Sequence, residues 1–136
     1  HVIPALIHKC YLSKSKNEKF VIKGSGKPLR QFIYSEDLAF LIKWTLYNYN
    51  DKNSIILSCG EKDEVSIAKV AKCIAKSFNY EGMIEFDETY SDGQFKKTAD
   101  NSKLIRLIGN YKFTNLEEGI QKSVSWFIDN YPNCRV

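Results

Sequence analysis

Residues 21–37 read VIKGSGKPLRQFIYSED, and this stretch decides how the rest of the chain is organised. Apolar, β-prone residues lead into Gly24 and Gly26, which allow backbone angles that other residues avoid. Pro28 stiffens the exit of the turn, and the run QFIY then predicts a second strand. Ser35 is a good helix N-cap, and the acidic residues that follow it suit a first helical turn. The stretch therefore predicts a strand, a glycine turn, a strand and a helix.

Three cations, Lys23, Lys27 and Arg30, surround this glycine corner and give it the charge to meet a phosphate. The alternative is an ordinary β-turn with solvated lysines, which the residues alone favour for Lys27. A guanidinium has a fork of donors that matches a diphosphate better than an ammonium does. Arg30 is therefore the strongest binding candidate, and a salt bridge to Glu36 or Asp37 is its competing interpretation.

The length, composition and charge of the chain bound its function. Its 136 residues suffice for one domain with a real core, and 43% apolar with 26% charged residues is a globular composition. No apolar run approaches the ~20 residues of a membrane helix, so no membrane partner is expected. The net charge of +4 suits a small anionic ligand and is too scattered to indicate nucleic acid. The chain begins with His1, inside what reads as a helix start, so we expect a fragment of a longer protein.

The cysteines indicate the setting of the protein. Cys10, Cys59, Cys73 and Cys134 form no CxxC pair and no histidine cluster accompanies them, so no metal site is predicted. Cys10 and Cys73 fall on apolar helix faces and are interpreted as buried small hydrophobes. A reduced, cytoplasmic setting fits this pattern best.

Apolar spacing along the chain predicts an α/β fold with more helices than strands, as one domain over residues 1–136. Helices are predicted at 2–13, 35–49, 67–78, 102–108 and 116–131, and Ser66 and Asn115 are the expected caps of the third and fifth. The continuous apolar run SIILSC at 54–59 predicts a buried strand, and MIEF at 83–86 a short one.

Four of these helices show a clear apolar face, and that of the first comprises Ile3, Leu6, Ile7 and Cys10. The third keeps the helical period without a break, at Ile67, Val70, Ala71, Ile74, Ala75 and Phe78. The second is predicted to bury Leu38, Leu41, Ile42, Thr45 and Leu46. The last is predicted to bury Leu116, Ile120, Val124, Phe127, Ile128 and Tyr131.

The segment GSGKPLRQFIYSEDLA at 24–39 resembles the pattern G-x-G-x-x-x-R-x-F-[VI]-[YH]-x-x-D-[LM]-A of the extended short-chain dehydrogenase/reductase superfamily. The tail TADNSKLIRLIGNYKFTNLEEGIQKSVSWF at 98–127 fits the same superfamily. There the first segment belongs to the small C-terminal substrate-binding domain of nucleotide-sugar epimerases, dehydratases and reductases. The resemblance implies that Arg30 reaches the nucleotide-sugar pyrophosphate.

Three further segments resemble the GDP-L-fucose synthase family within that superfamily: HVIPAL at 1–6, GEKDEVSI at 60–67 and SDGQFKK at 91–97. Enzymes of this family invert carbons 3 and 5 of GDP-4-keto-6-deoxymannose and then reduce its keto group with NADPH. The resemblance implies a GDP-sugar substrate, NADP as cofactor and a homodimeric parent enzyme. This chain is then its substrate-binding portion, which we expect to be inactive alone.

The resemblance also implies roles for single residues. His1 is placed near the nicotinamide as the acid in epimerisation, hence as a catalytic and cofactor-contacting residue; a frayed chain end is the alternative. Lys9 would meet the phosphates, or else be a solvated helix lysine. Asp92 would lie near the ribose or base, or else form an ordinary turn. Lys23 stands where the family has Trp, and would supply a phosphate or cation–π contact.

Two features of the parent enzyme do not occur in this sequence. Gly24 and Gly26 form no dinucleotide fingerprint, because Leu29 stands where the third glycine is required. No tyrosine is followed by a lysine four residues later. We therefore expect the cofactor and the catalytic tyrosine in a preceding Rossmann domain. Two alternatives stay open: another nucleotide-sugar epimerase or dehydratase, and a non-catalytic nucleotide-sugar-binding module.

Overall fold

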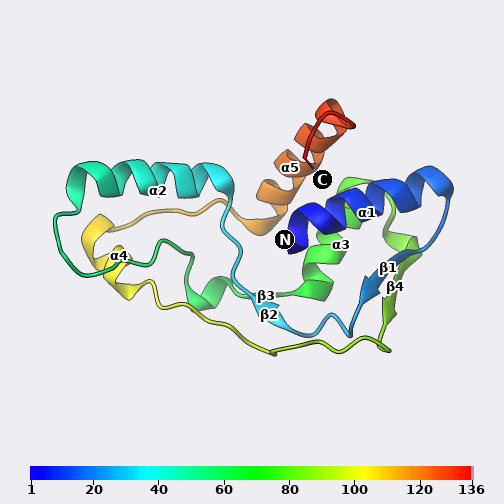
Figure 1. Cartoon of the computed structure of the whole chain (residues 1–136), viewed down its shortest axis with the longest axis horizontal. Coiled ribbons are helices and arrows are strands. Elements are labelled where there is room, and N and C mark those ends of the chain that lie inside the picture. The colour runs from blue at the N-terminus through cyan, green and yellow to red at the C-terminus, as the bar shows by residue number, and fades with distance from the viewer. Residues whose placement is uncertain (136) are drawn as a thin grey trace.

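Helices account for most of the regular structure in the computed structural model, which describes residues 1–135 (Figure 1). The elements in chain order are α1 Val2–Lys16, β1 Phe20–Lys23, β2 Leu29–Arg30, α2 Ser35–Asn48, the 3-10 turn η1 Glu61–Asp63, β3 Val65–Ser66, α3 Ile67–Ser77, the 3-10 turn η2 Glu81–Met83, β4 Ile84–Asp87, α4 Ser102–Ile108 and α5 Leu116–Asn130. The predicted α/β class is confirmed. None of the helices within residues 1–135 has the length and hydrophobicity to cross a lipid bilayer.

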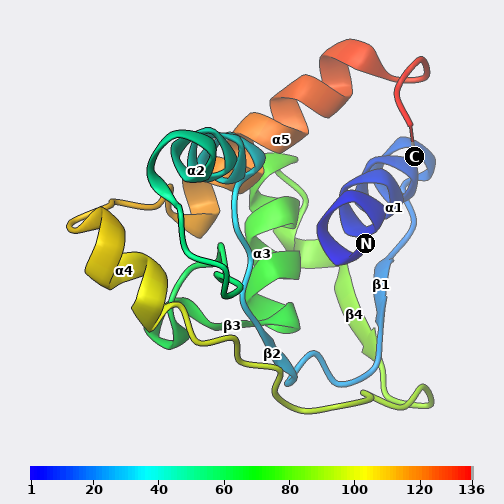
Figure 2. The same ribbon diagram turned by 60° about the vertical axis from the view of Figure 1, so that its left-hand side comes forward.

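The core lies where α1, α3 and α5 meet the strands β1 and β4, with α3 at its centre (Figure 2). The predicted face of α3 is confirmed, because Val70, Ala71, Ile74 and Ala75 are fully buried. Helix α1 contributes buried residues at Ile7 and Cys10, and α5 contributes Ile120, Val124 and Phe127. The caps are also as predicted: the Ser66 hydroxyl accepts from Lys69 N at 3.1 Å, and the Asn115 side chain accepts from Glu118 N at 2.9 Å.

Two short sheets bring the glycine corner next to a distant loop. Strands β1 and β4 pair in parallel, with Phe20 opposite Ile84 and Lys23 opposite Asp87. Strands β2 and β3 pair antiparallel, with Arg30 opposite Val65. The loop that follows β4 therefore starts beside Lys23, at the mouth of the corner.

Several boundaries differ from the prediction. The run at 31–34 is not a strand, because no strand within residues 1–135 pairs with it. The side chain of Gln31 instead ties the run to other loops: its Nε2 donates to Cys59 O at 2.9 Å, and its Oε1 accepts from Ala99 N at 2.7 Å. The N-cap of α2 is Tyr34, so Ser35 is the first helical residue. Helix α1 continues to Lys16, beyond the predicted end. Residues 54–59 form no strand, since no strand within residues 1–135 pairs with them.

Helix α2 and helix α4 lie to one side of the core, at the left of Figure 1. The predicted apolar face of α2 is wrong, because only Leu41 is fully buried while Ile42 and Leu46 are exposed. The helix contacts the chain before α5, through Asp37 and through Phe40 stacked on Tyr111, and none of its residues belongs to the core cluster of the described chain. On α5, Ile128 is likewise exposed.

A buried carboxylate ties α2 to the chain before α5. The carboxylate of Asp37 accepts hydrogen bonds from the Tyr111 hydroxyl at 2.7 Å and from Thr114 N at 2.9 Å. Asp37 is the aspartate of the superfamily pattern. From the sequence, its position in the first turn of the helix indicated only a favourable interaction with the helix dipole. The structure adds the bonds to Tyr111 and Thr114, which fix the orientation of α2.

The Tyr111 contact predicts an alkaline loss of stability. Burial and the bond to Asp37 raise the pKa of Tyr111 from 10.0 to about 12. A raised pKa of the folded state stabilises the fold below pH 10, and this contribution disappears as the pH rises through about 12. We expect urea unfolding to show a steeper fall in stability between these pH values for the parent chain than for Tyr111→Phe. A Tyr47→Phe control, on an exposed ring, should keep the parent slope; equal slopes for all three would remove Tyr111 from this role.

Candidate functional site

One groove gathers four of the five predicted site residues. A cavity of about 340 Å³ opens between α1, the end of β1 and the glycine corner, and Lys9, Lys23, Arg30 and Asp92 all line it. The apolar part of its wall comes from Val2, Ala5, Leu6, Val21, Ile22, Pro28 and Ile67. This size and this mixture of an apolar wall with a few polar groups are typical of small-molecule sites. The three cations favour an anionic ligand.

Both glycines of the corner are sterically required. Gly24 and Gly26 have φ angles of +89° and +73°, in the left-handed region. A Cβ at Gly24 would lie 2.5 Å from Asp92 Oδ1, and one at Gly26 would lie 2.5 Å from the Phe86 ring. Glycine is therefore needed at position 24 to let the loop after β4 approach, and at position 26 to leave room for the Phe86 ring of β4.

Asp92 closes that loop onto the corner. Its carboxylate accepts from Ser25 N at 2.7 Å and from Ser25 Oγ at 2.6 Å, and these bonds hold its pKa below the ordinary value. The resemblance places Asp92 near the ligand, and the structure gives it a second task, that of positioning the loop. Ser25 was not predicted as a functional residue.

Arg30 braces the same loop from the other side. Its Nη1 donates to Leu29 O at 2.6 Å and to Phe95 O at 3.3 Å, and its Nη2 donates to Gln94 O at 2.8 Å. A guanidinium has five N–H donors, so Nε–H and one Nη2–H remain for a ligand. The competing interpretation is wrong, because these carbonyls, rather than Glu36 or Asp37, are the partners of the guanidinium.

Lys23 meets an aromatic ring that the sequence did not single out. Its ammonium lies 4.4 Å from the centroid of the Tyr90 ring, a cation–π contact. Tyr90 is 47% exposed, so part of its ring remains open to a ligand.

Hydrogen bonds from Thr89, aided by the charges of Lys23 and Lys9, lower the pKa of Asp87. Asp87 thus offsets part of the positive charge at this end of the groove.

His1 lies outside the set of groove-lining residues. It occupies the exposed position before α1, where its side chain makes no capping bond, and its neighbour Val2 lines the groove. The other histidine, His8, packs against Phe127 and Tyr131, with ring centroids 5.9 and 5.6 Å away. The catalytic role predicted for His1 stays a prediction.

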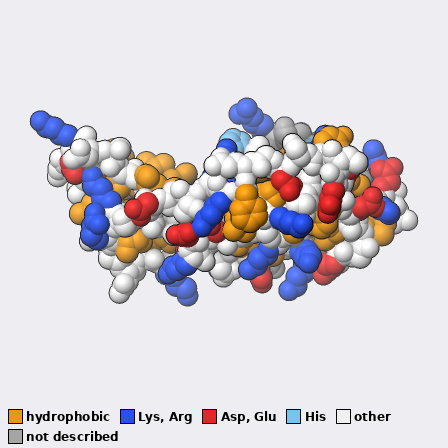
Figure 3. All heavy atoms as spheres, turned by 90° about the horizontal axis from the view of Figure 1, so that it is seen from below, with side chains coloured by type: hydrophobic (Ala, Val, Ile, Leu, Met, Phe, Trp, Pro, Cys, Tyr) orange, Lys and Arg blue, Asp and Glu red, His pale blue; other side chains and the backbone are white. Residues whose placement is uncertain are grey.

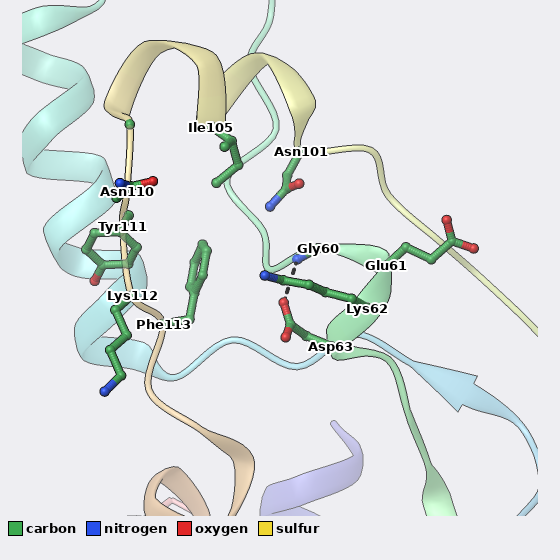
Figure 4. A pocket seen from close by; sticks show the side chains of 11 residues that line it. Gly60, Glu61, Lys62, Asp63, Asn101, Ile105, Asn110, Tyr111, Lys112 and Phe113 are labelled. Carbon is green, nitrogen blue, oxygen red and sulfur yellow. Dashed lines mark hydrogen bonds between the residues drawn. The ribbon is translucent and has the colours of Figure 1, made fainter.

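A larger hollow lies elsewhere, between η1, α4 and residues 109–113 (Figure 4). Its volume is about 650 Å³, and Ile105 and Phe113 point toward one another across it. Its carboxylates already have partners, since Asp63 accepts from Gly60 N at 3.1 Å and Glu61 pairs with Lys96. No three His, Cys, Asp or Glu side chains within residues 1–135 gather to hold a metal ion. The groove at the glycine corner is therefore the better candidate.

Known proteins are similar to this chain along nearly its whole length. Residues 1–60 match the model of the NAD dependent epimerase/dehydratase family. The chain is 51% identical to GDP-L-fucose synthase of Dictyostelium discoideum, over 99% of this chain and 42% of that protein. It is 48% identical to a probable GDP-L-fucose synthase of Drosophila melanogaster, over 99% of this chain and 44% of that one.

Solved structures indicate the same relatives as the sequence comparison does. A GDP-L-fucose synthetase from Naegleria fowleri superposes with a TM-score of 0.97 at 45% identity, covering 100% of this chain and 41% of that one. A second structure of that protein is described as bound to NADP. The first 60 residues thus resemble the NAD dependent epimerase/dehydratase family, and the chain as a whole is similar to GDP-L-fucose synthases. It spans about two fifths of the length of the curated relatives that it matches.

Proposed function

We propose that this chain is the substrate-binding portion of an NADPH-dependent GDP-4-keto-6-deoxy-D-mannose 3,5-epimerase-4-reductase, which makes GDP-L-fucose. The observation that carries the proposal is the convergence of Lys9, Lys23 and Arg30 on one groove. The names of the similar proteins from Dictyostelium and Naegleria support this substrate over other nucleotide sugars.

The groove offers complementary chemistry to each part of a GDP-sugar. The free donors of Arg30 suit the pyrophosphate, and Lys9 adds a second charge to it. Beside Lys23, which lines the groove, the Tyr90 ring offers a stacking surface for the base. Asp92 offers the remaining lone pairs of its carboxylate to ribose hydroxyls while it holds the loop in place.

The rest of the reaction divides between this chain and a preceding domain. That domain, a Rossmann fold, would hold most of the NADP and supply the tyrosine–lysine pair that protonates the keto oxygen. His1 would be the acid in epimerisation and would lie near the nicotinamide, because an imidazole is suited to proton transfer near neutral pH. We further propose that the parent enzyme is a homodimer in the cytoplasm, a setting that suits the four free cysteines.

An Arg30→Ala variant tests the groove directly. Hydrogen bonds to a charged group are worth about 1.5–3 kcal/mol, so we expect GDP to bind the variant roughly 10–150-fold more weakly in calorimetry. In the parent chain, GDP should shift the amide signals of the glycine corner and of Asp92. Arg106→Ala, on α4 and away from the groove, is the matched control and should bind GDP as the parent does.

The outcome tests two hypotheses, the pyrophosphate role of Arg30 and the preference for GDP, provided that circular dichroism shows a folded variant. Equal affinity of the parent and Arg30→Ala for GDP would refute the pyrophosphate role. UDP binding as tight as GDP binding would favour another nucleotide-sugar enzyme.

A further inference from the structure

The loop after β4 is held to the rest of the protein mainly by polar contacts. This loop, which we call the strap, comprises residues 88–100 and runs from β4 toward α4 along the lower edge of Figure 1. Residues 88–98 are all exposed, so burial of apolar groups contributes little to holding the strap. The view from below shows acidic and basic side chains mixed over this face of the molecule (Figure 3). Hydrogen bonds and ion pairs therefore decide where the strap lies.

Two carboxylates fasten the strap, one toward each end. At the first, Asp92 accepts two hydrogen bonds from Ser25. At the second, Glu64 accepts a hydrogen bond from the Thr98 hydroxyl through Oε1, and its Oε2 lies 3.3 Å from the Lys96 ammonium. The Glu64 side chain is only 5% exposed. A carboxylate loses much of its hydration at such a site, so it depends on these two strap residues as partners.

The backbone acceptors of Arg30 lie between these two fastenings. The guanidinium donates to Gln94 O at 2.8 Å and to Phe95 O at 3.3 Å. Leu29 N also donates to Phe95 O, at 2.8 Å. The Phe95 ring is 60% exposed, so its burial does not fix this part of the strap. The direction of the remaining Arg30 donors therefore depends on where the two fastenings hold these carbonyls.

Strand pairing places Glu64 beside Arg30. Arg30 in β2 lies opposite Val65 in β3, and Glu64 directly precedes Val65. Glu64 N donates to Glu61 O at 3.0 Å, which fixes the backbone before β3. The same small sheet thus carries both the guanidinium and the carboxylate that fastens the strap.

We propose that Glu64 is a positioning residue for GDP-sugar binding, because it holds Lys96 and Thr98 where the strap carbonyls orient the Arg30 guanidinium toward the groove. This inference rests on the proposed function, in which Arg30 grips the pyrophosphate. Glu64 is not among the described residues that line the groove, so its effect on the ligand passes through the strap. A guanidinium that is already oriented loses less side-chain freedom when the ligand binds, and this preorganisation strengthens binding.

A double-mutant cycle followed by GDP calorimetry tests the coupling. We expect Glu64→Ala to bind GDP at least about fivefold more weakly than the parent chain, within the range of coupling for residues that share one network. In the Arg30→Ala background the same substitution should cause no further loss, because both changes remove one contact. Guanosine, which has no phosphate, should bind the parent and Glu64→Ala equally. Glu85→Ala is the matched control: Glu85 is exposed and pairs with Lys19, so its loss should leave GDP affinity unaltered.

NMR gives a second readout that needs no ligand. In Glu64→Ala the Nε–H signal of Arg30 should shift or broaden, because the guanidinium loses its fixed orientation. The same signal should stay in place in Glu85→Ala. If Glu64→Ala does not fold, Thr98→Val takes its place in both measurements, since it removes one partner of Glu64 and keeps the ion pair with Lys96.

Three results would overturn the inference. The first is a GDP affinity of Glu64→Ala equal to that of the parent. The second is a set of losses that add in the double variant, and the third is an equal loss for guanosine, because either would indicate general damage to the groove. Absence of GDP binding by the parent chain would instead refute the proposed function. In that case the Arg30 signal alone would decide whether Glu64 orients the guanidinium.

Discussion

Replacing Ile74 with alanine is expected to lower the free energy of unfolding by about 2–5 kcal/mol. Ile74 is fully buried on α3, the helix that the core surrounds, between α1 and α5 and above the β1–β4 pair. The substitution removes three carbon atoms and leaves a cavity that these rigid neighbours fill only in part. Urea denaturation followed by circular dichroism would measure the loss as a lower midpoint with an unchanged slope.

Helix α2 supplies the control for this experiment. Ile42 belongs to the apolar face predicted for that helix, yet it is exposed. Ile42→Ala should therefore change stability by no more than about 0.5 kcal/mol in the chain alone. An unaltered midpoint for Ile74→Ala, or equal losses for the two variants, would show that the core has been misplaced.

The contrast between Ile74 and Ile42 also shows how far the sequence predicts the fold. Apolar periodicity identifies both helices and both faces, because it is a local property of the chain. It cannot say which surface will cover a face, and for α2 that surface is absent from the described residues. The same reason explains the segment 54–59: its composition indicates a buried strand, but a strand also needs a neighbour. The run at 31–34 lacks such a neighbour too, and the side chain of Gln31 ties it to two loops instead.

The sequence predicts only part of the candidate site, again because contacts between distant segments leave no local signal. The motifs identify Lys9, Lys23, Arg30 and Asp92, and the structure brings these four to one groove. Lys23, Arg30 and Asp92 gain their partners when the loop after β4 closes on the glycine corner, across 64 to 67 residues of sequence. The pairing of β1 with β4 brings Ser25 next to Asp92, and it brings the Lys23 ammonium next to the Tyr90 ring. No spacing within a single segment could have indicated these contacts.

The chain alone is expected to oxidise no NADPH with GDP-4-keto-6-deoxymannose. A chimera that joins the part of the Dictyostelium relative preceding the matched region to His1 of this chain is expected to catalyse the reaction. The chain has neither the third glycine of a dinucleotide fingerprint nor a lysine four residues after any tyrosine. Catalysis needs the acid, the base, the cofactor and the substrate held in register. A substrate groove without the cofactor and the tyrosine–lysine pair is therefore not expected to accelerate the reaction. Turnover of NADPH by the chain alone would contradict the two-part proposal.

His1 can be tested in the same chimera. Loss of a general acid typically costs about 10²–10⁴-fold in rate, so His1→Asn should reduce solvent-deuterium incorporation at the epimerised carbons by this factor. NADPH affinity should change little, because the preceding domain would hold most of the cofactor. His8→Asn is the matched control, since His8 packs on Phe127 and Tyr131 and should leave exchange unaltered. Deuterium incorporation by His1→Asn at the parent rate would remove His1 from the acid role, while leaving the groove assignment to be judged by Arg30.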